Sequence, residues 1–122
     1  GNTRNLVKML KRWQEVCNVP LKSFWLELLA IEFLESWEYK RESTIYYDWM
    51  TRDFFQFLIG KAGSFVIVPG TYEVIWLGRN WKSKAESAYR NAKEAAYDDS
   101  QGWHYVADGE WEKVFGSDVH LH

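Results

Sequence analysis

The chain has 122 residues, a length typical of one domain with a single hydrophobic core. Its 47% hydrophobic and 26% charged residues exclude a disordered chain. The net charge of −2, from 15 basic and 17 acidic residues, argues against an extensive nucleic-acid surface. A single cysteine, Cys17, excludes an internal disulfide, and no apolar run is long enough for a membrane span. We therefore expect a cytoplasmic protein with no membrane partner.

Two helical patterns open the chain, over residues 3–17 and 22–39. The first is amphipathic, with an apolar face and an opposite basic face formed by Arg4, Lys8, Lys11 and Arg12. The second is apolar almost all round, which is typical of the central helix of a bundle. Its start predicts Ser23 as the N-cap, with the aromatic Phe24 next to it.

The remaining pattern predicts two or three more helices and one extended segment. A third helix is expected over residues 44–59, and two β-prone runs then flank Pro69-Gly70. This segment, at about 65–77, is either a short hairpin or an extended apolar strap. A fourth helix with Asn80 as N-cap carries an alanine stripe over 81–96, residues 98–102 break it, and a short helix follows over 108–115. The predicted fold is mainly α: a single domain, residues 1–122, forming a compact bundle of four to five helices.

The strongest candidate site joins the basic face of the first helix to the start of the second. Lys8, Lys11 or Arg12 would neutralise a phosphate, which the N-terminus of a helix also favours. Ser23 would add a hydroxyl donor, and Phe24 a ring face on which a base stacks. From spacing alone, a solvated basic face, a simple cap and a core phenylalanine explain the same residues.

Other candidate groups are weaker. Asp98-Asp99 and the histidines His104, His120 and His122 suggest a small independent enzyme as one alternative, but a solvated turn and a frayed end explain them as well. No CxxC pair, P-loop or GxGxxG motif occurs, and we predict no metal site in this chain. Cys17 has no histidine near it in the sequence, so we expect a half-buried, structural thiol.

The early block resembles the helical C-terminal domain of the oligoadenylate-synthetase and cyclic-dinucleotide-synthase nucleotidyltransferases. The resemblance rests on Leu10-Lys11-Arg12-Trp13 followed by Ser23-Phe24-Trp25-Leu26-Glu27-Leu28-Leu29, and continues more loosely through Tyr46 to Leu58, Trp81 to Ala96 and Trp111 to Gly116. It implies that Lys11 and Ser23 contact the phosphates of a nucleoside triphosphate and that Phe24 stacks on its base. It also implies that the chain is the C-terminal part of a longer protein.

Two departures from the family pattern restrict what this chain is expected to do. Gly63-Ser64 stands alone, and no Asp-x-Asp occurs anywhere in the sequence. We therefore expect no catalysis by this chain alone, and expect Mg²⁺ in a catalytic domain of the same parent protein. The family's Asp-Pro-rich loop is replaced by Val68-Pro69-Gly70-Thr71. A non-catalytic interaction module, using the apolar segment Phe65 to Leu77, is the alternative function.

Overall fold

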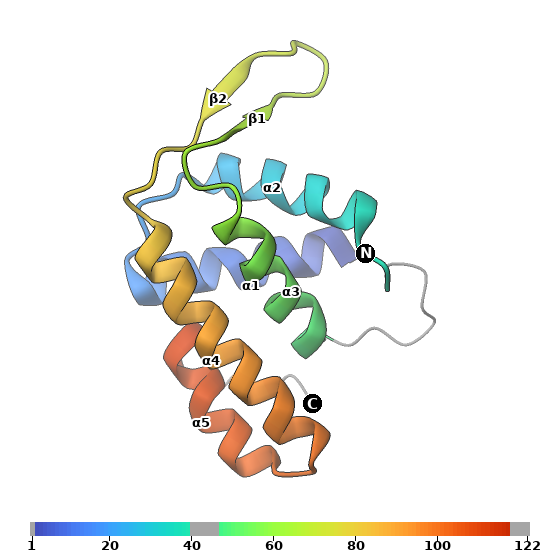
Figure 1. The fold of residues 1–122 in the computed structure, drawn as a ribbon, viewed down its shortest axis with the longest axis vertical. Coiled ribbons are helices and arrows are strands. Elements are labelled where there is room, and N and C mark those ends of the chain that lie inside the picture. The colour runs from blue at the N-terminus through green and yellow to red at the C-terminus, as the bar shows by residue number, and fades with distance from the viewer. Residues whose placement is uncertain (1, 40–46, 118–122) are drawn as a thin grey trace.

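The computed structural model describes residues 2–39 and 47–117, and in this part the chain forms five helices and one two-stranded hairpin. In chain order these are α1 (Asn2–Cys17), α2 (Ser23–Ser36), α3 (Tyr47–Ile59), β1 (Phe65–Ile67), β2 (Val74–Trp76), α4 (Lys82–Ser100) and α5 (His104–Phe115). The predicted fold, a mainly α bundle of four to five helices with a short extended or hairpin segment, is confirmed. In Figure 1, α1 and α2 lie side by side, α4 pairs with α5, and the hairpin projects at one end of the molecule.

Aromatic side chains fill the core where the helices meet. Trp13, Trp81 and Trp111 are fully buried, and each comes from a different part of the chain. The ring of Trp13 packs edge-on against Phe55 of α3 at 4.9 Å between centroids, and Phe55 in turn contacts Phe115 of α5. These contacts tie α1, α3 and α5 into one core.

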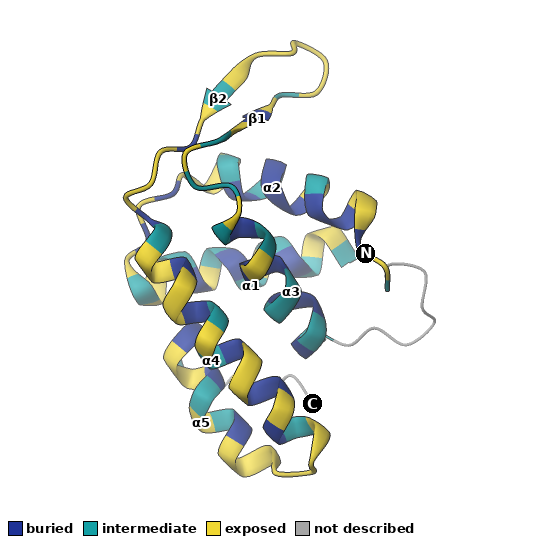
Figure 2. Cartoon of the chain, viewed as in Figure 1, coloured by how far each residue is buried: buried dark blue, intermediate teal, exposed yellow. Residues whose placement is uncertain are grey.

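The alanine stripe of α4 is buried, as its spacing predicts. Ala85, Ala88, Ala92, Ala95 and Ala96 face the neighbouring helices, and α4 packs against both α3 and α5. Figure 2 shows this as a buried band along α4 beside an exposed outer face. Small side chains permit this close approach because no bulky group separates the two backbones.

The segment after α3 is a hairpin and not an extended strap. Its strands pair antiparallel, with Phe65 opposite Trp76 and Ile67 opposite Val74. Gly70 lies in the connection with φ of 90°, a conformation that glycine adopts without strain. Successive side chains of a strand point to opposite faces, so Val66 is buried while its neighbours Phe65 and Ile67 are exposed.

Three predicted boundaries of the later helices are wrong. Trp81, not Asn80, is the N-cap of α4, because the buried Trp81 Nε1 donates a hydrogen bond to the Leu77 carbonyl at 2.7 Å and fixes the helix start there. The helix also continues through Asp98, which is buried, and ends at Ser100. As a result α5 begins at His104, four residues before the predicted start at Asp108.

The ends of the earlier helices differ less. The second helix stops at Ser36, not at Tyr39, since Trp37 adopts an extended conformation. The predicted start of the third helix, Thr44, lies outside the described residues, as do His120 and His122.

Candidate functional site

A cationic groove runs between α1 and α2. Its cavity volume is about 540 Å³, within the range of about 300–1,000 Å³ that small-molecule sites occupy. We call it the α1–α2 groove, and it is lined by Thr3, Arg4, Val7, Lys8, Lys11, Glu27 and Ile31. Among the described lining residues there are three cations and one carboxylate, an excess of positive charge that suits an anionic ligand.

The cations reach the groove because of their spacing on α1. Arg4, Lys8 and Lys11 follow one another at intervals of four and three residues, which places them on one face of a helix. The other side of α1 buries Leu6, Leu10 and Trp13 in the core and so fixes the direction of the basic face. Within the described residues, neither Arg4 nor Lys8 forms an ion pair.

Lys11 is the one groove cation with a partner among the described residues. Its Nζ lies 3.0 Å from Glu27 Oε1, and the two side chains are 45% and 42% exposed. Pairs this exposed contribute only about 0–1 kcal/mol to stability. A bound phosphate would therefore have to displace only a weak interaction to reach Lys11.

Ser23 does not cap α2, which corrects the prediction. Lys22 occupies the N-cap position, and no side chain accepts a cap hydrogen bond there. The Ser23 hydroxyl instead donates to Gln14 Oε1 at 3.1 Å, while Gln14 Nε2 donates to the Leu21 carbonyl. Ser23 thus fastens the start of α2 to α1, and it does not line the α1–α2 groove.

Phe24 is exposed to 50%, so it is not the core residue that a uniformly apolar helix suggests. It precedes Glu27 by three residues and Ile31 by seven, so all three lie on one face of α2. Phe24 is not among the lining residues of the groove, but it continues the same face toward the start of α2. A ring there is accessible for stacking.

Arg12 belongs to the fold and not to the site. Its Nε donates to the Phe115 carbonyl at 2.7 Å, and its Nη2 donates to the Ser117 carbonyl at 3.1 Å. Cations at the C-terminus of a helix compensate its unpaired carbonyls, so Arg12 holds the end of α5 against α1. Of the three basic candidates, the structure therefore places Lys8 and Lys11 in the lining of the groove, and Arg12 lies outside it.

The acidic residues at the α4–α5 junction are not a solvated turn. Asp99 Oδ2 accepts a hydrogen bond from Trp111 Nε1 at 3.2 Å, and its Oδ1 lies 2.9 Å from His104 Nδ1. Burial raises the pKa of the nearby Asp48 above its ordinary value of 3.8, and the charge of Asp99 adds to the increase. These contacts join α4 to α5, which is a structural use of the residues that suggested an independent enzyme.

Cys17 is half-buried, as predicted, with its Sγ 3.5 Å from the Lys113 carbonyl oxygen. Burial raises the pKa of the thiol above 9.0, and Lys84 only partly offsets this. A thiol with a raised pKa is a poor nucleophile at neutral pH.

Comparisons with known proteins identify no relative of this chain. No family model matches the chain, and no significant match was found among curated proteins or solved structures. None of the described helices has both the length and the apolar character that crossing a membrane requires. Within residues 2–39 and 47–117, no three His, Cys, Asp or Glu side chains gather closely enough to hold a metal ion.

Proposed function

We propose that this chain is the nucleotide-binding helical part of a template-independent nucleotidyltransferase. The observation that carries the proposal is the α1–α2 groove, in which Arg4, Lys8 and Lys11 line one wall beside an exposed aromatic ring. The groove would hold the phosphates of a nucleoside triphosphate on its cations, and Phe24 would stack on the base. The resemblance of the early sequence block to the oligoadenylate-synthetase and cyclic-dinucleotide-synthase enzymes supports the same assignment.

The roles of the three predicted residues are unequal. Lys11 lines the groove directly, and Glu27 competes with a phosphate for its ammonium group. Phe24 offers half of its surface on the same helix face as Glu27. Ser23 would contact a phosphate only if its hydroxyl left Gln14, so we assign it the weakest contribution.

The chemistry of nucleotidyl transfer is assigned to a different part of the parent protein. Mg²⁺ held by a catalytic domain would neutralise the phosphates and activate the attacking hydroxyl there. The described residues of this chain offer no matching set of ligands. The role proposed for this chain is to hold the edge of the nucleotide in place.

Calorimetric titration of ATP into the 122-residue chain tests the proposal. Lys11→Ala and Phe24→Ala should each weaken binding about five- to 150-fold, since a stacked base or a charged contact contributes about 1–3 kcal/mol. Lys84→Ala and Tyr105→Ala are matched controls on exposed positions of α4 and α5 and should leave the affinity unchanged. Equal ATP affinity in the wild type and in both groove variants would contradict the proposal.

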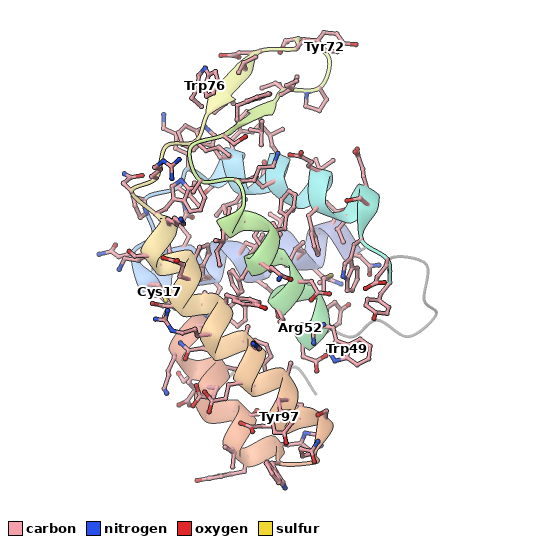
Figure 3. The ribbon with its side chains drawn as sticks, viewed as in Figure 1. Cys17, Trp49, Arg52, Tyr72, Trp76 and Tyr97 are labelled. Carbon is pink, nitrogen blue, oxygen red and sulfur yellow. The ribbon has the colours of Figure 1, made fainter. Side chains whose placement is uncertain are left out.

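A second candidate function is favoured by the hairpin. Phe65, Ile67, Val74 and Trp76 form two exposed cross-strand pairs, with the Phe65 and Trp76 rings 5.3 Å apart and Trp76 67% exposed. Figure 3 shows Trp76 and Tyr72 on the projecting hairpin. Because these four side chains are uncharged, two copies of the chain could pack them against each other.

Sedimentation velocity at rising protein concentration tests this alternative. The wild type should form a dimer, and Ile67→Lys should shift it to monomer because it places like charges on both sides of the contact. A wild-type chain that stays monomeric at millimolar concentration would rule out self-association.

A further inference from the structure

A second groove lies on a different part of the molecule, between the segment that follows α2, the first turns of α3 and the C-terminal half of α4. Its volume is about 370 Å³, and we call it the aromatic groove. Its lining residues are Tyr39, Trp49, Arg52, Lys93, Ala96, Tyr97 and Ser100. It shares no residue with the α1–α2 groove. Figure 3 shows Trp49 and Arg52 together on α3, with Tyr97 on the neighbouring α4.

Three aromatic rings from three segments of the chain line this groove. The rings of Tyr39 and Trp49 lie 5.4 Å apart at an angle of 55°, and the Arg52 guanidinium lies over the Trp49 ring at 5.8 Å. The side chain of Tyr97 is 58% exposed, although aromatic side chains usually bury most of their surface. Of these three rings, Tyr97 offers the exposed surface against which a flat ligand can stack.

Among the described lining residues of the groove, the two charged side chains, Arg52 and Lys93, are both positive. Arg52 Nε donates to Asp53 Oδ1 at 2.9 Å, and Asp53 is itself held by a hydrogen bond from Trp37 Nε1. This uses one nitrogen of the guanidinium and fixes its orientation. Within the described part of the chain, its terminal nitrogens and the Lys93 ammonium form no hydrogen bond or ion pair.

The lining residues that the structure describes include two cations and no carboxylate, in a chain whose net charge is −2. An oriented guanidinium with unused terminal donors is well suited to a phosphate, which it binds through two hydrogen bonds. Stacking surfaces and phosphate donors in one small groove require a ligand that has both a flat ring and an anionic group.

We propose that the aromatic groove binds one nucleotide unit, with its base against the exposed ring of Tyr97 and its phosphate on Arg52 and Lys93. The volume of about 370 Å³ is near the lower end of the range for small-molecule sites and suits a single nucleotide. The same chemistry is offered by a free mononucleotide and by one residue of a single strand. This site is independent of the function proposed for the α1–α2 groove.

Titration of the ¹⁵N-labelled 122-residue chain with AMP, followed by amide NMR, separates the two grooves. Binding here should shift the signals of Trp49, Arg52, Lys93 and Tyr97, whereas binding in the other groove would shift those of Lys8, Lys11 and Phe24. Lys93→Gln and Tyr97→Ala should each weaken AMP binding at this site about tenfold. Both side chains are exposed, so the variants should keep the wild-type circular dichroism spectrum.

Matched controls are Lys84→Gln, on the same helix but outside the groove, and Tyr105→Ala, which is almost fully exposed on α5. Both should bind AMP like the wild type. Adenosine and inorganic phosphate should each bind more weakly than AMP, and tighter binding of a six-residue oligoadenylate would assign the ligand to a single strand. The proposal is overturned if AMP leaves the amide signals of the aromatic groove unchanged, or if Lys93→Gln and Tyr97→Ala bind AMP like the controls. It is also overturned if phosphate or adenosine alone binds as well as AMP.

Discussion

Replacing Glu27 by glutamine should strengthen nucleotide binding in the α1–α2 groove. Glu27 places a carboxylate 3.0 Å from the Lys11 ammonium, which is the position a phosphate would need. Both side chains are more than 40% exposed, so the interaction is screened by water. Two unit charges about 4 Å apart interact by about 1 kcal/mol in water, so removing the competing charge should raise ATP affinity about fivefold.

Stability should hardly change in the same variant. The exposed pair contributes about 0–1 kcal/mol, so the urea midpoint of Glu27→Gln should lie close to that of the wild type. Glu86→Gln, an exposed position on α4, makes the same change of net charge away from the groove and should not alter ATP affinity. If Glu27→Gln binds ATP as weakly as Lys11→Ala does, then Glu27 positions Lys11 for the ligand. The Glu27 carboxylate would then not compete with a phosphate for the Lys11 ammonium.

Arg12→Ala should lower the free energy of unfolding by about 1.5 kcal/mol, because it removes two charged hydrogen bonds to the carbonyls of Phe115 and Ser117. Urea denaturation measures this change. Arg4→Ala is the matched control, and its free energy of unfolding should be close to that of the wild type. An equal loss of free energy in both variants would contradict the structural role of Arg12. Asp48→Asn should stabilise the protein at pH 7, because the folded state raises the pKa of this carboxyl above 3.8 and therefore disfavours its charged form. As the pH rises from 3.8 through the raised pKa, the free energy of unfolding of the wild type should fall relative to that of Asp48→Asn. If the difference between the two proteins does not vary with pH, the burial of a charged Asp48 does not destabilise the fold.

Much of the fold follows from local patterns in the sequence. The face that α1 buries is set by the spacing of Leu6, Leu10 and Trp13, and the alanine stripe of α4 likewise marks its packing face. Pro69-Gly70 between two β-prone runs is enough to suggest the hairpin, although not to exclude a strap. These features depend on residues a few positions apart, whose relative directions are fixed by helix and strand geometry.

The helix ends were less predictable because they depend on distant partners. Asn80 is a good cap by type, yet the burial of Trp81 and its bond to Leu77 decide where α4 begins. The pair Asp98-Asp99 is typical of a turn, but the contacts of Asp99 with Trp111 and His104 keep it at a helix junction. No local pattern reveals a partner five or twelve residues away on another helix.

The candidate site was predicted in part. The basic face indicated Lys8 and Lys11, which the structure places in the α1–α2 groove, while the hydrogen bond from Arg12 to a carbonyl 103 residues later has no local signal in the sequence. Phe24 is exposed, a property that an all-apolar helix conceals, because every position of such a helix looks equally suited to the core. Ser23 does not cap α2, because its hydroxyl donates a hydrogen bond to the side chain of Gln14.

Titration of the wild-type chain with ATP, followed by amide NMR, tests the central claim most directly. The account predicts saturable shifts along the α1–α2 groove, at Arg4, Lys8, Lys11 and Phe24, that weaken as salt concentration rises. Absence of any shift in this groove at millimolar ATP would contradict the claim that it holds a nucleotide.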